Sequence, residues 1–391
     1  METKNKINLL QNKKVAIIGG GPGGLTLARL LQLQNVAVTV YERDLNKDAR
    51  VQGSTLDLHE TSGLAAIRKA NLLAEFKNNF LPQADKTVIT DDQATVFFSD
   101  HETNREENFG DAHYRPEIDR GALRKILLES LETETVVWDS QFLSMEPHNE
   151  GWLLNFKNGQ AAYADIVIAS DGANSKIRPY LTNTKALYSG ITMLEGNIAE
   201  SKKTTPNIAA LVKGGKIMAF GNTKNILLGQ KGNDNLGFYA SFKTDEKWAS
   251  TNGLDYSNIP EVTEWFKNQY PEWSSIWQEL FENASSPFIP RPIYYMPLDQ
   301  NWKTLPNLTM IGDAAHVMPP FAGEGANMAM LDALELSEYL TSSDFKTLEE
   351  AIASFENNMR QRAAEATHES LENGEKMHAS DALQTMLAFF S

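Results

Sequence analysis

The chain has 391 residues, 41% of them hydrophobic, and its 36 basic and 51 acidic side chains give a formal net charge of −15. This composition supports a sizeable core, and at about 150 residues per domain the length predicts two or three domains. The excess of acidic side chains argues against nucleic-acid and anionic membrane partners. The absence of cysteine excludes disulfide scaffolds, thiolate metal sites and cysteine nucleophiles. Because the sequence shows neither a signal peptide nor an apolar run long enough to span a bilayer, it predicts a soluble, cytoplasmic protein.

The first strong pattern is a β-branched run at residues 15–18, followed by a glycine cluster, and it predicts a buried parallel strand. Helix-forming, leucine-rich residues follow at 25–31, and a second strand is expected at 36–41. A strand, a glycine turn, a helix and a strand in this order are typical of the first βαβ unit of a doubly wound sheet.

Further along, short apolar runs predict buried strands at 136–138, 166–169 and 308–311. Residues 188–244 consist of short strands broken by turns rich in Gly, Asn and Lys, which is typical of a mostly antiparallel sheet. Helices are expected at 117–131 with Asp119 as the N-cap, at 262–281 with a break at Pro271, at 326–340, and from 348 towards 377. We therefore expect the antiparallel segment to be an insertion in one nucleotide-type domain, whose segments 15–24 and 308–325 lie together.

The glycine turn at residues 19–24 contains the pattern G-x-G-x-x-G. Glycines there allow a tight turn and let backbone N–H groups approach a pyrophosphate at the positive end of the following helix. Glu42 stands 23 residues after Gly19 at the end of the next strand, where a carboxylate accepts hydrogen bonds from ribose hydroxyls. Arg43 beside it either stacks on an adenine or forms a surface ion pair. These features favour a dinucleotide site over a turn without a ligand, with candidate contacts from Gly19, Gly21, Pro22, Gly23, Gly24, Glu42 and Arg43.

Two later motifs also follow predicted strands. Asp171 opens the motif DGANSKIR, and Asp313 lies in the motif GDAAH. Because ligands bind outside the carboxyl ends of parallel strands, Asp313 is a candidate to bind a ribityl hydroxyl, unless it caps a helix. His316 is more simply a structural histidine. The following stretch PPFAGEGAN predicts close approach of a ligand to the next helix, with candidate contacts from Pro320, Gly323, Gly325, Ala326 and Asn327.

Together the three motifs resemble the class A flavoprotein aromatic hydroxylases, the para-hydroxybenzoate hydroxylase-like group, and within it the tetracycline-inactivating monooxygenases of the TetX type. The similarity extends over nearly the whole chain and includes NLL at residues 8–10 and STLDLH at 54–59. It implies an α/β fold with a Rossmann-type FAD-binding domain (residues 1–80, 105–183 and 300–345), an inserted antiparallel-sheet substrate domain (81–104 and 184–299) and a C-terminal bridging helix (346–391).

The resemblance implies that FAD is held by Glu42, Arg43, Arg124 and Asp313, with Asp171 of the second motif nearby. Arg124 matches the family's flavin-contacting arginine, and a surface ion pair is the less favoured alternative for it. NADPH or NADH would reduce the FAD without a Rossmann domain of its own, and no second G-x-G-x-x-G occurs. No metal is expected, because the seven histidines lack the spacing of metal ligands.

The substrate sheet departs from the TetX-type pattern, in which a glutamine, an arginine and a histidine meet the drug. Glu195, Lys216 and Gly237 stand at those places, and they bring a carboxylate, lose the planar guanidinium fork and remove an imidazole donor. Met218 and Phe321 do match the pattern. Phe220 is a further candidate unless it only packs in the core, and Met386 with Phe389 either caps the substrate entrance or docks on the core.

We therefore expect a monomeric, FAD-dependent and NAD(P)H-driven monooxygenase. It would insert one oxygen atom from dioxygen into an enol or phenol-like ring, with tetracycline as the candidate substrate and antibiotic resistance as the consequence. The alternatives are a hydroxylase of an unrelated aromatic compound, a dehydrogenase without oxygen insertion, and a flavoprotein that binds an antibiotic or pigment without turnover. The sequence names no catalytic base.

Overall fold

A computed structural model of the chain describes residues 9–49, 55–103 and 108–390, so Asn8 and Ser54 of the motifs above lie outside the described residues. Its central element is a parallel sheet in the order β18-β12-β1-β2-β8. The strands are β1 (Val15–Ile18), β2 (Val38–Tyr41), β8 (Val136–Val137), β12 (Ile166–Ala169) and β18 (Leu308–Met310). Because Ile18 pairs with Ala169 and Ala169 pairs with Met310, the carboxyl ends of three strands meet at one edge. All the predicted parallel strands are confirmed, with β2 beginning two residues late.

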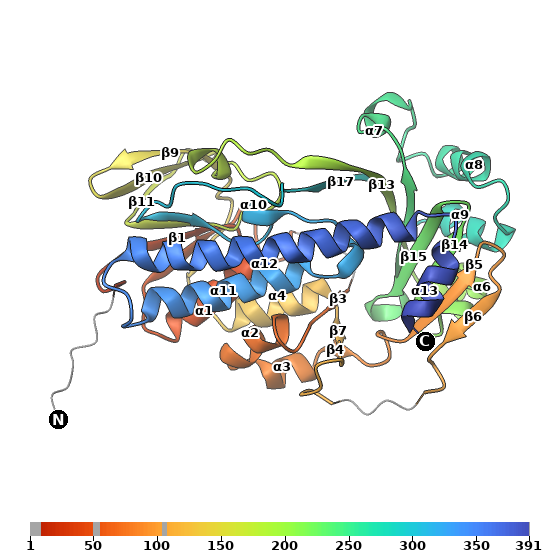
Figure 1. The fold of residues 1–391 in the computed structure, drawn as a ribbon, viewed down its shortest axis with the longest axis horizontal. Coiled ribbons are helices and arrows are strands. Elements are labelled where there is room, and N and C mark those ends of the chain that lie inside the picture. Colours follow the sequence, from red (N-terminus) through yellow and green to blue (C-terminus); the bar gives the residue numbers. More distant parts are fainter. Residues whose placement is uncertain (1–8, 50–54, 104–107, 391) are drawn as a thin grey trace.

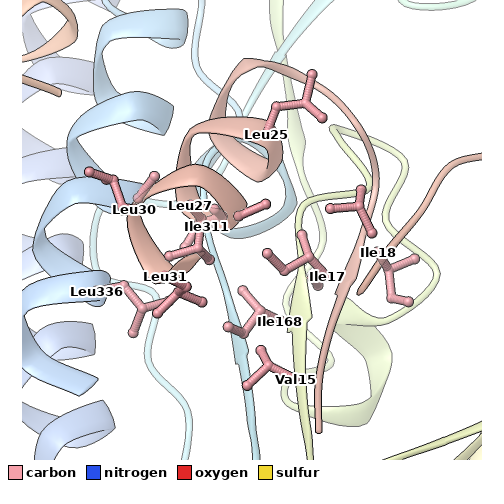
Figure 2. Packing of buried hydrophobic residues seen from close by; sticks show 14 of the residues in the cluster. Val15, Ile17, Ile18, Leu25, Leu27, Leu30, Leu31, Ile168, Ile311 and Leu336 are labelled. Carbon is pink, nitrogen blue, oxygen red and sulfur yellow. The ribbon is translucent and has the colours of Figure 1, made fainter. Parts of the chain in front are cut away.

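Helices cover one face of this sheet (Figure 1). Leu25, Leu27 and Leu31 of the first helix are fully buried, and Figure 2 shows Leu31 beside Leu336. The leucines whose helix-forming composition predicted this helix therefore also provide its core face. The helices of this layer are α1 (Pro22–Gln32), α2 (Gly63–Lys69), α3 (Leu73–Lys77), α4 (Arg120–Glu129), α11 (Gly325–Thr341) and α12 (Leu348–Met377).

A three-stranded antiparallel sheet lies on the other side of the parallel sheet in Figure 1. Phe156 from this sheet stacks on Tyr41 of β2 with 4.6 Å between ring centroids. Its strands are β9 (Phe142–His148), β10 (Gly151–Phe156) and β11 (Ala161–Ala164). A smaller sheet in the order β3-β7-β4 joins β3 (Leu56–Asp57), β7 (Glu117–Ile118) and β4 (Phe80–Leu81).

The second large sheet has seven strands in the order β17-β13-β16-β15-β14-β5-β6. Its back is covered by short helices, and Trp277, Phe238, Phe266 and Phe281 are buried between them and the sheet. The strands are β5 (Thr87–Asp91), β6 (Val96–Ser99), β13 (Leu187–Ile198), β14 (Lys216–Gly221), β15 (Lys224–Gln230), β16 (Leu236–Lys243) and β17 (Ile289–Tyr295). The helices are α5 (Ser201–Thr204), α6 (Pro206–Val212), α7 (Trp248–Thr251), α8 (Ile259–Gln269) and α9 (Gln278–Glu282).

The long helix α12 runs from the parallel-sheet layer to the seven-stranded sheet (Figure 1). Its C-terminal end is fixed there by His378, which is hydrogen-bonded to Ser241 of β16 (2.8 Å) and Asn225 of β15 (3.2 Å). The last helix, α13 (Ala382–Phe390), then packs beside β14 and β5. No helix in the described ranges is long and apolar enough to cross a membrane.

Two expectations about elements need correction. The helix expected from residue 117 begins at Arg120, because the Asp119 carboxylate accepts the N–H of Gly121 (2.8 Å) and caps the helix. Residues 201–212, expected within the antiparallel sheet, instead form α5 and α6. The sheet is mostly antiparallel, as expected: β14 is antiparallel to β15, and its parallel pairing with β5 connects segments far apart in the chain. The predicted helix break at Pro271 is confirmed, since α8 ends at Gln269.

Candidate functional site

A large cleft of about 2540 Å³ lies between the carboxyl edge of the parallel sheet and the front of the seven-stranded sheet. Its walls include the glycine turn after β1, the loop at residues 317–325 after α10 (Asp313–His316), and side chains of β13, β14 and β16. Residues 15–24 and 308–325 thus lie together as predicted, because β12 pairs with both β1 and β18.

The glycine turn combines close packing on one side with open space on the other. A Cβ atom on Gly24 would stand 2.2 Å from the Gly19 carbonyl oxygen, and Gly19 itself has a φ of +111°. Gly21, in contrast, lines the cleft, and a Cβ atom there would meet nothing within 4 Å. Gly21 is also the N-cap of α1 and provides no side-chain cap, so the positive end of this helix is left for an anion.

Glu42 at the end of β2 is 2% exposed and lies directly behind this turn. Its carboxylate accepts the N–H groups of Gly20 (2.6 Å) and Asp44 (3.0 Å), which fixes its position. Arg43 lines the cleft. Arg124 is 5% exposed and donates to Asp44 (3.1 Å), so an ion pair is present but does not lie at the surface: it is formed by a buried arginine and a half-buried aspartate, and it joins α4 to the segment after β2.

Asp313 lines the cleft as the first residue of α10, whose N-cap is Gly312, so Asp313 does not cap this helix. Arg178 connects the second and third motifs, since its guanidinium donates to the carbonyl oxygens of Asp313 (2.8 Å) and Ala314 (2.8 Å). Asp171 accepts the N–H of Lys176 (2.8 Å) and so shapes the second motif locally. Arg178 was missed from the sequence because its partners are backbone atoms of a distant segment.

His316 is buried and structural, as its simpler interpretation predicted. Its Nε2 lies 2.5 Å from Asp332 Oδ2, and the carboxylate beside it raises the pKa of the imidazole. Asp332 also accepts the N–H of Gly312 (2.8 Å) and a bond from Arg362 (2.8 Å). The group therefore anchors the Gly312–Asp313 turn to α11 and α12.

The 317–325 loop provides Pro320, Phe321, Gly323 and Gly325 to the cleft, followed by Ala326 of α11. Asn327 lies behind them and is fully buried. Its side-chain oxygen accepts the N–H groups of His59 (2.9 Å) and Gly63 (3.2 Å), and its amide donates to the carbonyl of Asp57 (2.9 Å). Asn327 thus holds this loop against the segment after β3.

The substrate residues expected from the sequence divide into two groups. Glu195, Lys216, Met218, Gly237 and Phe321 line the cleft. Phe220 and Met386 are 2% and 7% exposed and pack in one apolar cluster between β14 and α13. From α13 it is Phe389 and Phe390 that reach the cleft wall.

Both charged substrate candidates have partners that the sequence did not indicate. Glu195 Oε2 lies 2.9 Å from Arg291 Nε on β17, and Lys216 Nζ lies 3.2 Å from Glu117 Oε1 on β7. Each pair joins segments distant in sequence, so no local spacing pointed to either.

A second cluster of polar side chains lies where β3 meets the 317–325 loop. His59 is flanked by Asp57 Oδ2 at 3.1 Å from Nε2 and by Glu324 Oε1 at 3.1 Å from Nδ1. Burial lowers the pKa of His59, but hydrogen bonds and charge from the two carboxylates outweigh it and raise the pKa to about 9. The imidazolium therefore binds the loop to β3 at neutral pH.

We expect this link to weaken in alkali. A group whose folded pKa is raised stabilises the fold fully below its unfolded value, near 6.5, and loses that contribution as the pH rises through about 9. The melting temperature of the wild type should therefore fall relative to that of His59→Gln between pH 7 and 10. Parallel melting curves for the two proteins would contradict this assignment.

Comparisons with known proteins identify the family and the fold. The family model described as FAD binding domain matches residues 12–205 and 304–370. Monooxygenase asqM of Emericella nidulans is 29% identical over 380 residues, covering 84% of this chain and 83% of that protein. The 3-amino-4-hydroxybenzoate 2-monooxygenase PtmB3 of Streptomyces platensis is 25% identical over 388 residues, with 96% and 91% covered. The crystal structure of tetracycline destructase Tet(51) has the same fold, with a TM-score of 0.69 at 16% identity and coverage of 94% and 91%.

Proposed function

Since the chain belongs to the family of the FAD binding domain and is a flavin-dependent monooxygenase, we propose that it uses NADPH or NADH to insert one oxygen atom from dioxygen into an enol or phenol-like ring. The observation that carries this proposal is the single cleft that the glycine turn, the 317–325 loop and the seven-stranded sheet share. FAD, when bound, supplies the electron transfer and the activation of dioxygen.

The residues of the cleft fit FAD. The positions of Gly21 and Gly325 have open space where a side chain would stand, and both lie at the start of helices without a side-chain cap. The start of α1 would bind the pyrophosphate, and that of α11 would stabilise negative charge on the reduced ring. Glu42 would bind the ribose and Asp313 the ribityl chain.

The protein's own contribution is to orient the substrate and exclude water. The wall provided by Met218, Phe321 and Phe390 is apolar, whereas Glu195 and Lys216 are charged groups on the seven-stranded sheet. Such a wall suits a flat ring that carries a polar edge.

Tetracycline is the substrate we propose to test first, on the basis of the fold shared with Tet(51) and of Met218 and Phe321 at the cleft. The ion pair of Glu195 with Arg291 and the glycine at position 237 change the polar part of this wall. An unrelated phenolic compound is therefore the second candidate, and binding of an antibiotic without turnover is the third.

The test is to incubate the FAD-loaded protein with NADPH and tetracycline, and separately with 3-amino-4-hydroxybenzoate. We expect loss of the drug's near-visible absorbance together with one dioxygen consumed per NADPH. Oxidation of NADPH that yields only hydrogen peroxide with both compounds would contradict both substrates and favour binding without turnover.

Replacing Glu42 by alanine should weaken FAD binding by about 1–3 kcal/mol, because two charge-assisted hydrogen bonds to the ribose are lost. FAD fluorescence during titration of the apoprotein measures this change. Glu338→Ala is the control, since Glu338 forms an exposed ion pair with Lys69 at the surface. Unchanged affinity in the Glu42 variant would refute the assignment.

A further inference from the structure

The cleft contains two carboxylates that face each other across a pair of strands. Asp57 of β3 and Glu117 of β7 are direct partners in the antiparallel register, and both line the cleft. Side chains in such a pair stand on the same face, with Cβ atoms about 5 Å apart. Two carboxylates so close, in a partly buried place, do not both ionise readily.

The pair lies where the cofactor loop meets the substrate wall. A Cβ atom on Gly323 would stand 3.1 Å from Asp57 Oδ1, so Asp57 touches the loop. On the other side, Lys216 Nζ on β14 lies 3.2 Å from Glu117 Oε1. A substrate ring that is bound between the 317–325 loop and β14 therefore lies beside the two carboxylates and the Lys216 ammonium.

The two carboxylates have different partners. Asp57 is held by the imidazolium of His59, which keeps its pKa below the ordinary value although burial acts against it. Burial, with the charge of Asp57, raises the pKa of Glu117, and Lys216 only partly offsets this. The pKa values of the two carboxyl groups are pushed apart, and Glu117 is the member whose surroundings favour the protonated form.

The charges of the surrounding groups also favour one proton on this pair of carboxylates. Asp57, Glu117 and Glu324 provide three negative charges against the two positive charges of His59 and Lys216. Arg115 and Asp85 act on the same group from the neighbouring segments and add one charge of each sign. One proton on a carboxylate therefore neutralises the cluster.

We propose that Glu117 is the catalytic base that removes the proton from the ring hydroxyl of the substrate, with the Lys216 ammonium binding the oxyanion that results. The O–H bond of the substrate breaks, its electron pair remains on the substrate oxygen, and a new O–H bond forms on the Glu117 carboxyl group. The ring becomes electron-rich for oxygen insertion, and the proton returns to the product oxygen when the product leaves. Asp57 and His59 are positioning residues that keep a negative charge beside Glu117. This inference rests on the proposed function and specifies its substrates as compounds with an ionisable ring hydroxyl.

The first experiment uses binding without turnover. The FAD-loaded protein is titrated with 4-nitrophenol, whose phenolate absorbs visible light, at a pH where the free compound is mostly protonated. We expect the wild type to produce the phenolate band on binding and Glu117→Gln to lose it. Glu60→Gln, a carboxylate paired with Arg68 in a nearby segment, is the matched control and should keep the band. A wild type without the band, or a Glu117→Gln protein with an equal band, would overturn the proposal.

Turnover provides the second measurement. With a substrate found in the panel above, Glu117→Gln should hydroxylate about 10²–10⁴-fold more slowly at neutral pH while still binding FAD. The rate of the wild type should rise with pH as Glu117 ionises, and in the variant this rise should move to the pKa of the substrate's own hydroxyl. A more acidic, halogenated analogue should rescue the variant, which a merely structural role of Glu117 does not explain.

A second variant covers the case in which Glu117→Gln folds poorly. Lys216→Met should keep the FAD and lose most of the phenolate band, because the oxyanion loses its cation. A wild type that ionises 4-nitrophenol but hydroxylates no compound contradicts the proposed function and supports the role of Glu117. Hydroxylation by Glu117→Gln at the wild-type rate and with the wild-type pH profile overturns the role of Glu117 alone.

Discussion

Replacing Gly21 by valine is expected to abolish FAD binding while leaving the apoprotein folded. Gly21 has extended backbone angles that any residue adopts, and nothing lies within 4 Å of the position of a Cβ atom. The valine side chain therefore has little effect on the free energy of unfolding of the apoprotein. It occupies the space where the pyrophosphate approaches α1, and overpacking of this kind costs about 3 kcal/mol or more, roughly a hundred-fold in Kd.

The measurement is the ratio of flavin to protein absorbance after gel filtration in excess FAD, together with the melting temperature of the apoprotein. Gly232→Val is the control for adding the same side chain in open space away from the cleft. Gly24→Val should behave oppositely and unfold the protein, because its Cβ atom meets the Gly19 carbonyl oxygen at 2.2 Å. Stoichiometric flavin in the Gly21 variant would place the cofactor elsewhere.

Replacing Asp332 by alanine is expected to lower the free energy of unfolding by about 3–5 kcal/mol, because it leaves the buried His316 without its counter-charge and removes one of the two carboxylates that bind Arg362. Asp332 is fully buried and binds His316, Arg362 and the N–H of Gly312 at once. The turn that presents Asp313 should loosen together with the fold, so FAD affinity should fall as well.

Urea denaturation of the apoprotein measures the loss of stability. Glu338→Ala is a suitable control, since the ion pair of Glu338 with Lys69 is half-exposed and worth less than about 1 kcal/mol. If the Asp332 variant is destabilised no more than this control, the buried group does not carry the stability assigned to it.

The sequence predicted the parallel sheet and its glycine turn well, because their signals are local. A β-branched run, an adjacent G-x-G-x-x-G and an acidic residue at the next strand's end lie within a short stretch of chain. The flavoprotein fold and the FAD binding of the family are confirmed.

The substrate half was predicted less well, for a physical reason. Three side chains form ion pairs with residues of distant segments. Glu195 pairs with Arg291, Lys216 with Glu117, and His59 with Glu324. Strand pairings such as β14 with β5 bring such residues together, and no local periodicity encodes those pairings. The site residues named from the sequence therefore stay predictions until the variants above are measured.

The neighbouring positions of β1, β12 and β18 have a consequence for biosynthesis. On the ribosome, β12 leaves the exit tunnel long before residues 308–310 are translated, so one edge of the parallel sheet stays unpaired while five strands of the seven-stranded sheet, β13 to β17, are made. The nascent chain gains its complete nucleotide fold only near the end of translation, and a message truncated before β18 would yield a polypeptide with an open, aggregation-prone strand edge.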